Sequence, residues 1–157
     1  MSANEAISQV FHRYALGVDE DDFDLFATCF AEDACFETAS QPRIEGREAI
    51  CDYFRARRQA RRSRGEQSRH LITNVVLLEE SATEAIAVAY VTGLIATGSH
   101  SFDFHCGWYR DRLVKPAGGQ WQISEHFIHA DGSDPANPIL PVGFRFRPES
   151  VAPVEGP

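Results

Sequence analysis

The first twenty positions alternate between apolar and polar residues with the period of an α-helix. Apolar side chains recur at steps of three and four residues, which predicts a helix over residues 3–18 with one buried face. Ser2 and Glu5 precede this face in the spacing of a capping box, where side chains satisfy free backbone N–H groups of the first turn. The members of the apolar face are Ile7, Val10, Phe11, Tyr14, Ala15 and Val18.

Two more helices and a short strand are predicted before residue 65. The acidic run at residues 19–22 ends the first helix and caps a short second helix. The apolar residues of that second helix are Phe23, Leu25, Phe26, Cys29 and Phe30. Residues 34–38 resemble a short strand, and Gly46 precedes a third helix that turns Ile50, Tyr53 and Phe54 inward.

From His70 onward the pattern changes to that of β-strands. Four long strands, rich in Val, Ile, Thr and aromatic residues, are predicted at 69–79, 83–97, 101–115 and 119–130. Short turns separate the four strands, so successive strands should form antiparallel hairpins. Helices followed by strands indicate an α+β fold, and a twisted sheet with helices on its concave face would enclose a pocket.

The chain has the length of one domain. Its 157 residues suffice for one substantial core, and we expect residues 1–133 to form it. Residues 134–157 are rich in proline and should form an extended tail that packs on or near the pocket mouth. No internal repeat or second domain is evident.

Charge and targeting signals exclude several classes of function. The net charge of −8 argues against general affinity for nucleic acid or for an anionic membrane. The N-terminus lacks the basic start and apolar run of a signal peptide, and no apolar stretch is long enough to span a bilayer. We therefore expect a cytoplasmic protein with no nucleic-acid or membrane partner.

The cysteines and arginines form no obvious site. Four cysteines without C-x-x-C spacing are typical of reduced thiols rather than of a disulfide framework. Seven arginines between positions 55 and 69 are most simply a solvated helix face with its following loop. A patch that binds an anionic ligand or a partner is the alternative for these arginines.

Asp19 and His70 are the candidate catalytic residues. Each is an ionisable residue beside apolar neighbours, in a domain too small to keep them far apart. A carboxylate that orients an imidazole makes a general base that works near neutral pH without a metal or cofactor. Taken singly, Asp19 is typical of a helix cap and His70 of a core histidine. The histidine spacings match no metal motif, so no metal is predicted.

The strand at 101–115 offers further candidates on two opposite faces. His105, Gly107, Tyr109 and Asp111 alternate with Phe104, Cys106, Trp108 and Arg110. One of these sets should line the pocket, and periodicity does not tell which.

Four segments of the chain resemble the SnoaL-like group of the nuclear transport factor 2-like superfamily. They are residues 7–46, 69–74, 107–113 and 119–123, and the similarity extends over about residues 3–130. The resemblance implies a cone-shaped α+β barrel, in which three N-terminal helices pack on a strongly curved antiparallel sheet around one deep apolar pocket. It does not imply one reaction, because the superfamily includes cyclases, dehydratases, isomerases, oxygenase β subunits and non-enzymes.

Two lyases of this group, scytalone dehydratase and hexachlorocyclohexane dehydrochlorinase, have a catalytic Asp and His at matching points. Gly17-Val18-Asp19 and His70-Leu71-Ile72-Thr73-Asn74 are the corresponding segments here. The resemblance implies that Asp19 orients His70 and that His70 is the general base. Scytalone dehydratase has a second histidine that falls near Ala96 and Thr97, where this chain has none, so the leaving-group machinery stays open.

The sequence thus predicts a cofactor-independent, dehydratase-like lyase that acts on a small hydrophobic cyclic substrate. The candidate substrate-binding residues are Tyr14, His105, Trp108, Tyr109 and Arg110. An isomerase or cyclase with the same Asp–His pair is one alternative. A non-catalytic binding protein, an oxygenase β-subunit-like protein and a dimerisation domain with a filled interior are others. Exposed apolar residues on the open sheet face predict a homodimer or homotrimer.

Overall fold

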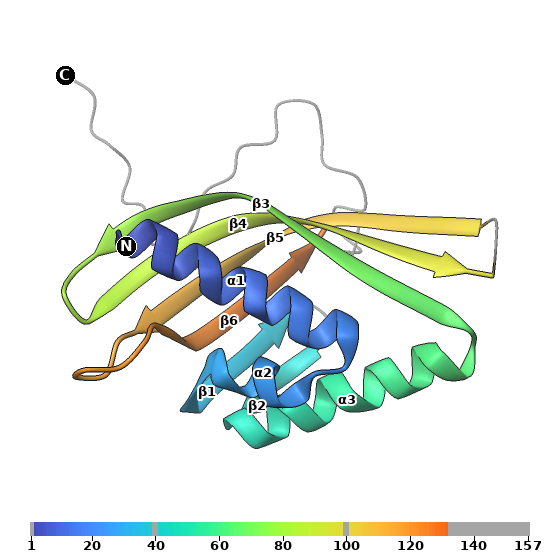
Figure 1. Ribbon diagram of the computed structural model, residues 1–157, viewed down its shortest axis with the longest axis horizontal. Helices are drawn as coiled ribbons and strands as arrows, with labels where there is room; N and C mark the ends of the chain where they lie inside the picture. The colour runs from blue at the N-terminus through green and yellow to red at the C-terminus, as the bar shows by residue number, and fades with distance from the viewer. Residues whose placement is uncertain (1, 39–40, 99–100, 132–157) are drawn as a thin grey trace.

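The computed structural model describes residues 2–38, 41–98 and 101–131, and it arranges them as helices packed on a long curved sheet (Figure 1). In chain order the elements are α1 (Ala3–Glu20), α2 (Phe23–Thr28), β1 (Phe30–Thr38), β2 (Gln41–Glu45), α3 (Arg47–Ser63), β3 (Glu66–Glu80), β4 (Glu84–Thr97), β5 (Ser101–Val114) and β6 (Gln122–Ala130). The predicted tail at 134–157 lies outside the described residues.

Helix α1 is the central buried element. Ser2 and Glu5 form the predicted capping box, and the predicted apolar face is buried along its length. Gly17 allows the next helix to approach closely, because a Cβ at this position would lie 2.9 Å from the Cβ of Phe26. The chain can therefore fold back at Asp21, which has a left-handed φ of 59°, and begin α2 with Asp22 as its N-cap.

The six strands form one sheet in the order β2-β1-β6-β5-β4-β3. The predicted hairpins from β3 to β6 are all antiparallel. The sheet is nevertheless mixed, because β1 pairs with β6 in parallel, a crossover that hydrophobic patterning did not predict. Two boundaries also differ from the prediction: Cys29 and Phe30 follow α2 instead of belonging to it, and β2 is an additional short edge strand.

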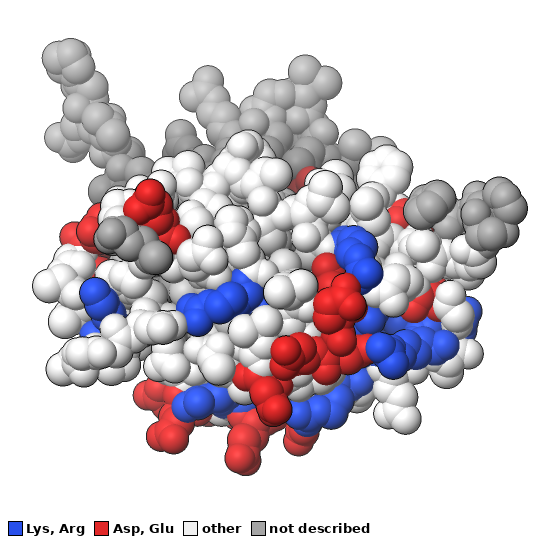
Figure 2. Space-filling model, viewed as in Figure 1, with Lys and Arg blue, Asp and Glu red and all other residues white. Residues whose placement is uncertain are grey.

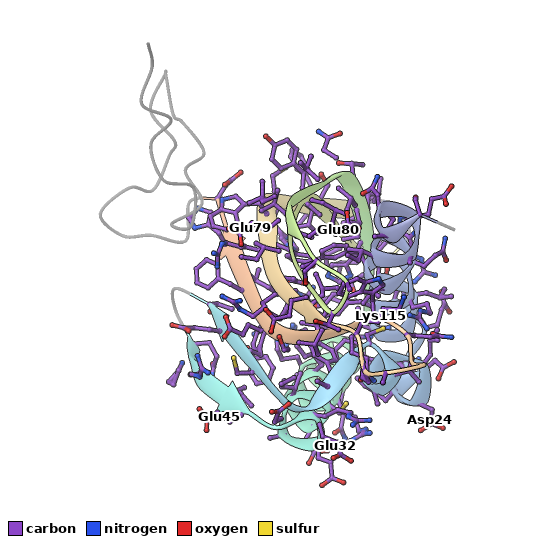
Figure 3. The ribbon with its side chains drawn as sticks, turned by 90° about the vertical axis from the view of Figure 1, so that its left-hand side faces the viewer. Asp24, Glu32, Glu45, Glu79, Glu80 and Lys115 are labelled. Carbon is purple, nitrogen blue, oxygen red and sulfur yellow. The ribbon has the colours of Figure 1, made fainter. Side chains whose placement is uncertain are left out.

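The sheet curves around α1, as the view roughly along this helix shows (Figure 3). The labelled acidic side chains of that view lie outside the core, with Glu79 and Glu80 at one end of the molecule and Glu32 and Glu45 at the other. The core between α1 and the sheet is strongly aromatic, with Phe26 and Phe30 fully buried. The predicted α+β fold is thus confirmed, with a hollow between the helices and the concave face.

Acidic and basic side chains are intermixed over the C-terminal ends of α1 and α3 (Figure 2). Arg69 pairs with Glu20 at 3.0 Å there, and Arg62 pairs with Asp21. Within the described ranges, neither long helix combines the length and apolar composition needed to cross a bilayer.

Candidate functional site

A cavity of about 310 Å³ opens between the helices and the concave face of the sheet. This volume lies at the low end of the range found for small-molecule sites. Its apolar wall includes Val18 of α1, Phe54 of α3 and Val91 of β4. Because the interior holds a cavity of this size, the expectation of a filled dimerisation domain is wrong.

Asp19 and His70 meet at this cavity, as the sequence predicted. Asp19 lies in the last turn of α1 and is only 5% exposed. Its Oδ1 is 2.7 Å from Nδ1 of His70, and its Oδ2 accepts a hydrogen bond of 2.7 Å from the backbone N–H of His70. Both carboxylate oxygens are therefore directed at one residue of β3.

The geometry selects one role for each nitrogen of His70. An ionised carboxylate only accepts hydrogen bonds, so Nδ1 carries the proton and donates it to Asp19. The other ring nitrogen, Nε2, then has a lone pair, and His70 lines the cavity. A proton taken up by Nε2 would form an imidazolium, which the buried carboxylate stabilises.

Arg58 of α3 anchors this pair, and sequence reasoning missed it. The Arg58 side chain is almost completely buried and joins three segments. Its Nη2 donates to the carbonyl oxygen of Asp19 at 2.9 Å, Nε to Asp21 at 2.8 Å and Nη1 to the hydroxyl of Ser68 at 3.0 Å. Carbonyls at a helix C-terminus lack helical partners, so the arginine satisfies the end of α1.

The prediction of a solvated arginine face is therefore wrong for part of the run. Arg58 and Arg61 continue the inner face of α3 that begins with Ile50 and Phe54, at spacings of four, four and three residues. This spacing was the signal that would have found them in the sequence. Arg57 and Arg61 line the cavity together with Arg58.

Tyr14 and Tyr109, two of the predicted substrate-binding residues, form the aromatic floor of the cavity. Their ring centroids are 5.6 Å apart and their hydroxyl groups are hydrogen-bonded to each other. Burial raises the pKa of both phenols well above the usual value. Both remain neutral hydrogen-bond donors, which suits a floor that faces developing negative charge.

His105 also lines the cavity, in the same row of the sheet as His70. Gly93 of β4 pairs with His70 on one side and with His105 on the other. A Cβ at Gly93 would lie 2.2 Å from Cε1 of His105, so the glycine gives the imidazole room to lie across the strand. Burial, and then the positive charges of His70, Arg61 and Arg57, lower the pKa of His105.

Trp108 and Arg110 do not lie where the prediction placed them. His105, Gly107 and Tyr109 of β5 line the cavity, and Trp108 and Arg110, which alternate with them, lie on the opposite face. There Trp108 stacks on His129, with ring centroids 5.1 Å apart. The two residues were predicted because alternation alone did not tell which set faces inward.

A second Asp–His pair lies behind the aromatic floor. Nδ1 of His126 is 2.6 Å from Oδ1 of Asp111, and neither side chain is exposed. The two residues are direct partners in the β5–β6 register, but a register shift between Arg112 and Leu113 hides this pairing from a count that starts at the hairpin turn. Burial raises the pKa of Asp111. This pair does not line the cavity, whereas His70, held by Asp19, does.

The described residues contain no group of three or more His, Cys, Asp or Glu side chains arranged to hold a metal ion. Cys29, Cys35 and Cys51 are buried free thiols, and Cys106 is exposed.

Comparison with known proteins identifies the family of the chain. The family model of the SnoaL-like domain matches residues 1–126. The chain belongs to the SnoaL-like domain family. None of the curated proteins matches this SnoaL-like chain significantly.

Solved structures share the SnoaL-like architecture. A function-unknown protein from Mycobacterium tuberculosis is 30% identical, with a TM-score of 0.69 over 80% of this chain and 70% of that one. A candidate scytalone dehydratase from Novosphingobium aromaticivorans is 21% identical, with a TM-score of 0.69 over 80% and 82% of the two chains.

A third structure, of a Catenulispora acidiphila protein in complex with S-DNPA, is 23% identical. Its TM-score is 0.67, over 80% of this SnoaL-like chain and 91% of that one. At these identities the last two structures show the fold alone. The resemblance found in the sequence is confirmed at the level of family and fold.

Proposed function

We propose that this SnoaL-like protein is a cofactor-independent lyase of the dehydratase type, acting on a small, largely apolar cyclic substrate. The hydrogen bond of 2.7 Å between Asp19 and Nδ1 of His70, at the wall of the cavity, is the observation that carries this proposal. His129 also lines the cavity, but its Nε2 is 3.7 Å from the carboxylate of Asp131, well beyond the 2.7 Å of the Asp19–His70 contact.

In the proposed reaction, Nε2 of His70 removes a proton from a substrate carbon, and the electron pair left behind forms a double bond to the neighbouring carbon. The hydroxyl or halide on that carbon leaves, a hydroxyl as water with the proton of the His70 imidazolium and a halide as the anion. Asp19 holds the ring in the required tautomer and stabilises the imidazolium that forms. Tyr109, whose oxygen accepts the hydroxyl hydrogen of Tyr14, donates its own hydroxyl hydrogen to the negative charge that develops on the substrate. The apolar wall keeps bulk water from the reacting atoms. Proton transfer of this kind contributes about 10²–10⁴ in rate.

The test uses His70→Gln and Asp19→Asn in an assay of small cyclic alcohols, ketones and halides. We expect each variant to lose on the order of 10²–10⁴ of the turnover rate, the share that positioned proton transfer supplies. The matched controls are His12→Gln and Glu20→Gln, because both residues are exposed and lie on the same helix as Asp19. The controls should keep wild-type rates, and thermal melts should show that all four variants are folded.

Full activity in either His70→Gln or Asp19→Asn would remove the pair from the mechanism. The same assay in deuterated water separates the second candidate, an isomerase or cyclase. The tyrosine pair on the floor favours this candidate, because the hydroxyl of Tyr109, itself supported by that of Tyr14, can hold an enolate while the proton returns to another atom of the substrate. A product that keeps all the heavy atoms of the substrate and gains a new C–D bond would show isomerisation. A product that has lost water or halide would show elimination.

The proposal includes a reducing, cytoplasmic location and a homo-oligomeric assembly. Three buried thiols without a disulfide support the first. Exposed apolar side chains on the outer face of the sheet support the second.

A further inference from the structure

The charged residues that line the cavity all have the same sign. Arg57, Arg58 and Arg61 contribute to the lining, and no Asp or Glu side chain does so among the described residues. This contrasts with the chain as a whole, which carries a net charge of −8. A basic hollow in an acidic protein focuses its field on anionic small molecules.

Arg58 is not available to such a molecule, because its guanidinium is committed to Asp21, Ser68 and the end of α1. Arg61 is different. Its Nη1 is buried and has no hydrogen-bond partner among the described residues. Its neighbour Glu66 is already held by Arg64 through two hydrogen bonds of 2.7 and 2.8 Å.

A guanidinium nitrogen that is buried without a partner is costly, so a protein keeps one where a ligand supplies the missing acceptor. Burial and the positive charge of Arg57 lower the pKa of Arg61, which shows that the surroundings disfavour its charge. An arginine nevertheless stays protonated in proteins. Arg57 adds a second cation at the same place, held over the ring of Tyr53 and bonded to its hydroxyl at 3.2 Å.

These residues lie at one end of the cavity. The C-terminal end of α3 leads into β3 beside the end of β4 and the start of β5 (Figure 1). The register places His70 and His105 in one row there, whereas Tyr109 lies four residues farther along β5. The cavity is therefore basic near α3 and aromatic at its floor.

We infer that the substrate carries a carboxylate, which Arg61 and Arg57 bind while the apolar ring extends toward Tyr14 and Tyr109. The planar fork of a guanidinium matches the two oxygens of a carboxylate. This inference rests on the proposed function only in taking the cavity as the substrate site. It defines the substrate class as small cyclic carboxylic acids.

Calorimetric binding of benzoate, compared with its neutral isostere benzamide, tests the inference without any turnover. We expect benzoate to bind the wild-type protein at least tenfold more tightly than benzamide. Arg61→Gln should weaken benzoate at least tenfold and leave benzamide unchanged. Arg55→Gln is the matched control, because Arg55 is an exposed arginine on the same helix and does not line the cavity. Its binding should equal that of the wild type.

A thermal melt gives a second readout that a folding defect would not mimic. Removal of the guanidinium nitrogen that is buried without a partner should raise the melting temperature of the ligand-free Arg61→Gln protein. Added benzoate should stabilise the wild type and Arg55→Gln but not Arg61→Gln. Arg61→Lys keeps a cation and should retain part of the preference for benzoate. Equal binding of benzoate and benzamide, or an Arg61→Gln variant with unchanged benzoate affinity, would overturn the inference.

The failure of this inference and that of the proposed function are distinguishable. Benzoate selectivity without turnover of any cyclic acid would leave the carboxylate site standing and contradict the lyase. Turnover of a neutral substrate that is lost in His70→Gln and unchanged in Arg61→Gln would support the lyase and contradict the carboxylate site.

Discussion

At the scale of single residues, the site depends on side chains whose environment differs from their ordinary one. Arg58 was predicted to be solvated, and the structure buries it as the link between α1, α3 and β3. Arginines in a run are usually solvated, so the residue type of Arg58 predicted exposure. Its helical spacing from Ile50 and Phe54 predicted burial instead. The Asp19–His70 pair was predicted from two ionisable residues beside apolar neighbours in a small domain, and the family resemblance then implied their roles, since residues fifty-one positions apart carry no local signal of contact.

His105 gives the protein a defined pH dependence of stability. Its folded-state pKa is lowered from 6.5 by burial and by the charges of His70, Arg61 and Arg57, so the folded state binds fewer protons than the unfolded one. Stability should therefore be lost as pH falls below about 6.5, until the folded-state imidazole also becomes protonated. When the pH is lowered from 7.5 into this range, the urea midpoint of unfolding should fall less in His105→Gln than in the wild type.

His12→Gln is the control for this measurement, because His12 is exposed on α1. It should reproduce the wild-type profile. Parallel profiles for the wild type and His105→Gln would show that His105 is not the group responsible.

At the scale of elements, apolar periodicity predicted the three helices and the four long strands. It failed where pairing is nonlocal. Strand β1 joins β6 in parallel, and the short edge strand β2 has two consecutive exposed residues that break any alternation. Strand β3 shows a subtler case. His70 and Ile72 face inward and so do Val75 and Leu77, although strict alternation would turn one of these pairs outward.

A β-bulge resolves this conflict in β3. The register with β4 shifts between Thr73 and Val76, and Asn74 within the shift has a left-handed φ of 53°. Asparagine tolerates this conformation, whereas alanine pays roughly 1–2 kcal/mol there. We expect Asn74→Ala to lower the free energy of unfolding by about that amount. Asn74→Gly should cost less, because glycine adopts positive φ readily.

Urea denaturation of these variants measures the difference, with Thr73→Ala as the control at the neighbouring position. Equal destabilisation by Asn74→Ala and Asn74→Gly would mean that the asparagine side chain, not its backbone conformation, matters. The site adds a second readout: if the bulge holds His70 inward, Asn74→Ala should also weaken ligand binding at the cavity.

At the scale of the whole molecule, the fold separates two faces of one sheet. The concave face supplies the cavity and the Asp19–His70 pair, and α1 and α3 cover it. The sequence could predict that such a hollow exists, because long strands with few helices leave a curved sheet partly filled. It could not predict which face of β5 lines it, since Tyr109 and Trp108 are equally apolar and only the register with β6 distinguishes them.

The convex face carries exposed apolar side chains that argue for self-association. Leu71, Tyr90 and Phe104 are 48%, 50% and 73% exposed on β3, β4 and β5. Apolar surface gathered on neighbouring strands commonly marks an interface. We therefore expect a homodimer or homotrimer at micromolar concentration, and Tyr90→Glu should dissociate it because a buried carboxylate without a partner disfavours the interface. Analytical ultracentrifugation measures the mass directly.

Leu16→Glu is the matched control, because Leu16 is 55% exposed but lies on α1 instead of the convex face. If any exposed leucine or tyrosine sufficed for association, the two variants would behave alike. If the convex face is the interface, only Tyr90→Glu becomes a monomer, and ligand binding at the cavity survives because Tyr90 faces away from it. A wild-type monomer at these concentrations would contradict the assembly and leave the proposed chemistry of the cavity untouched.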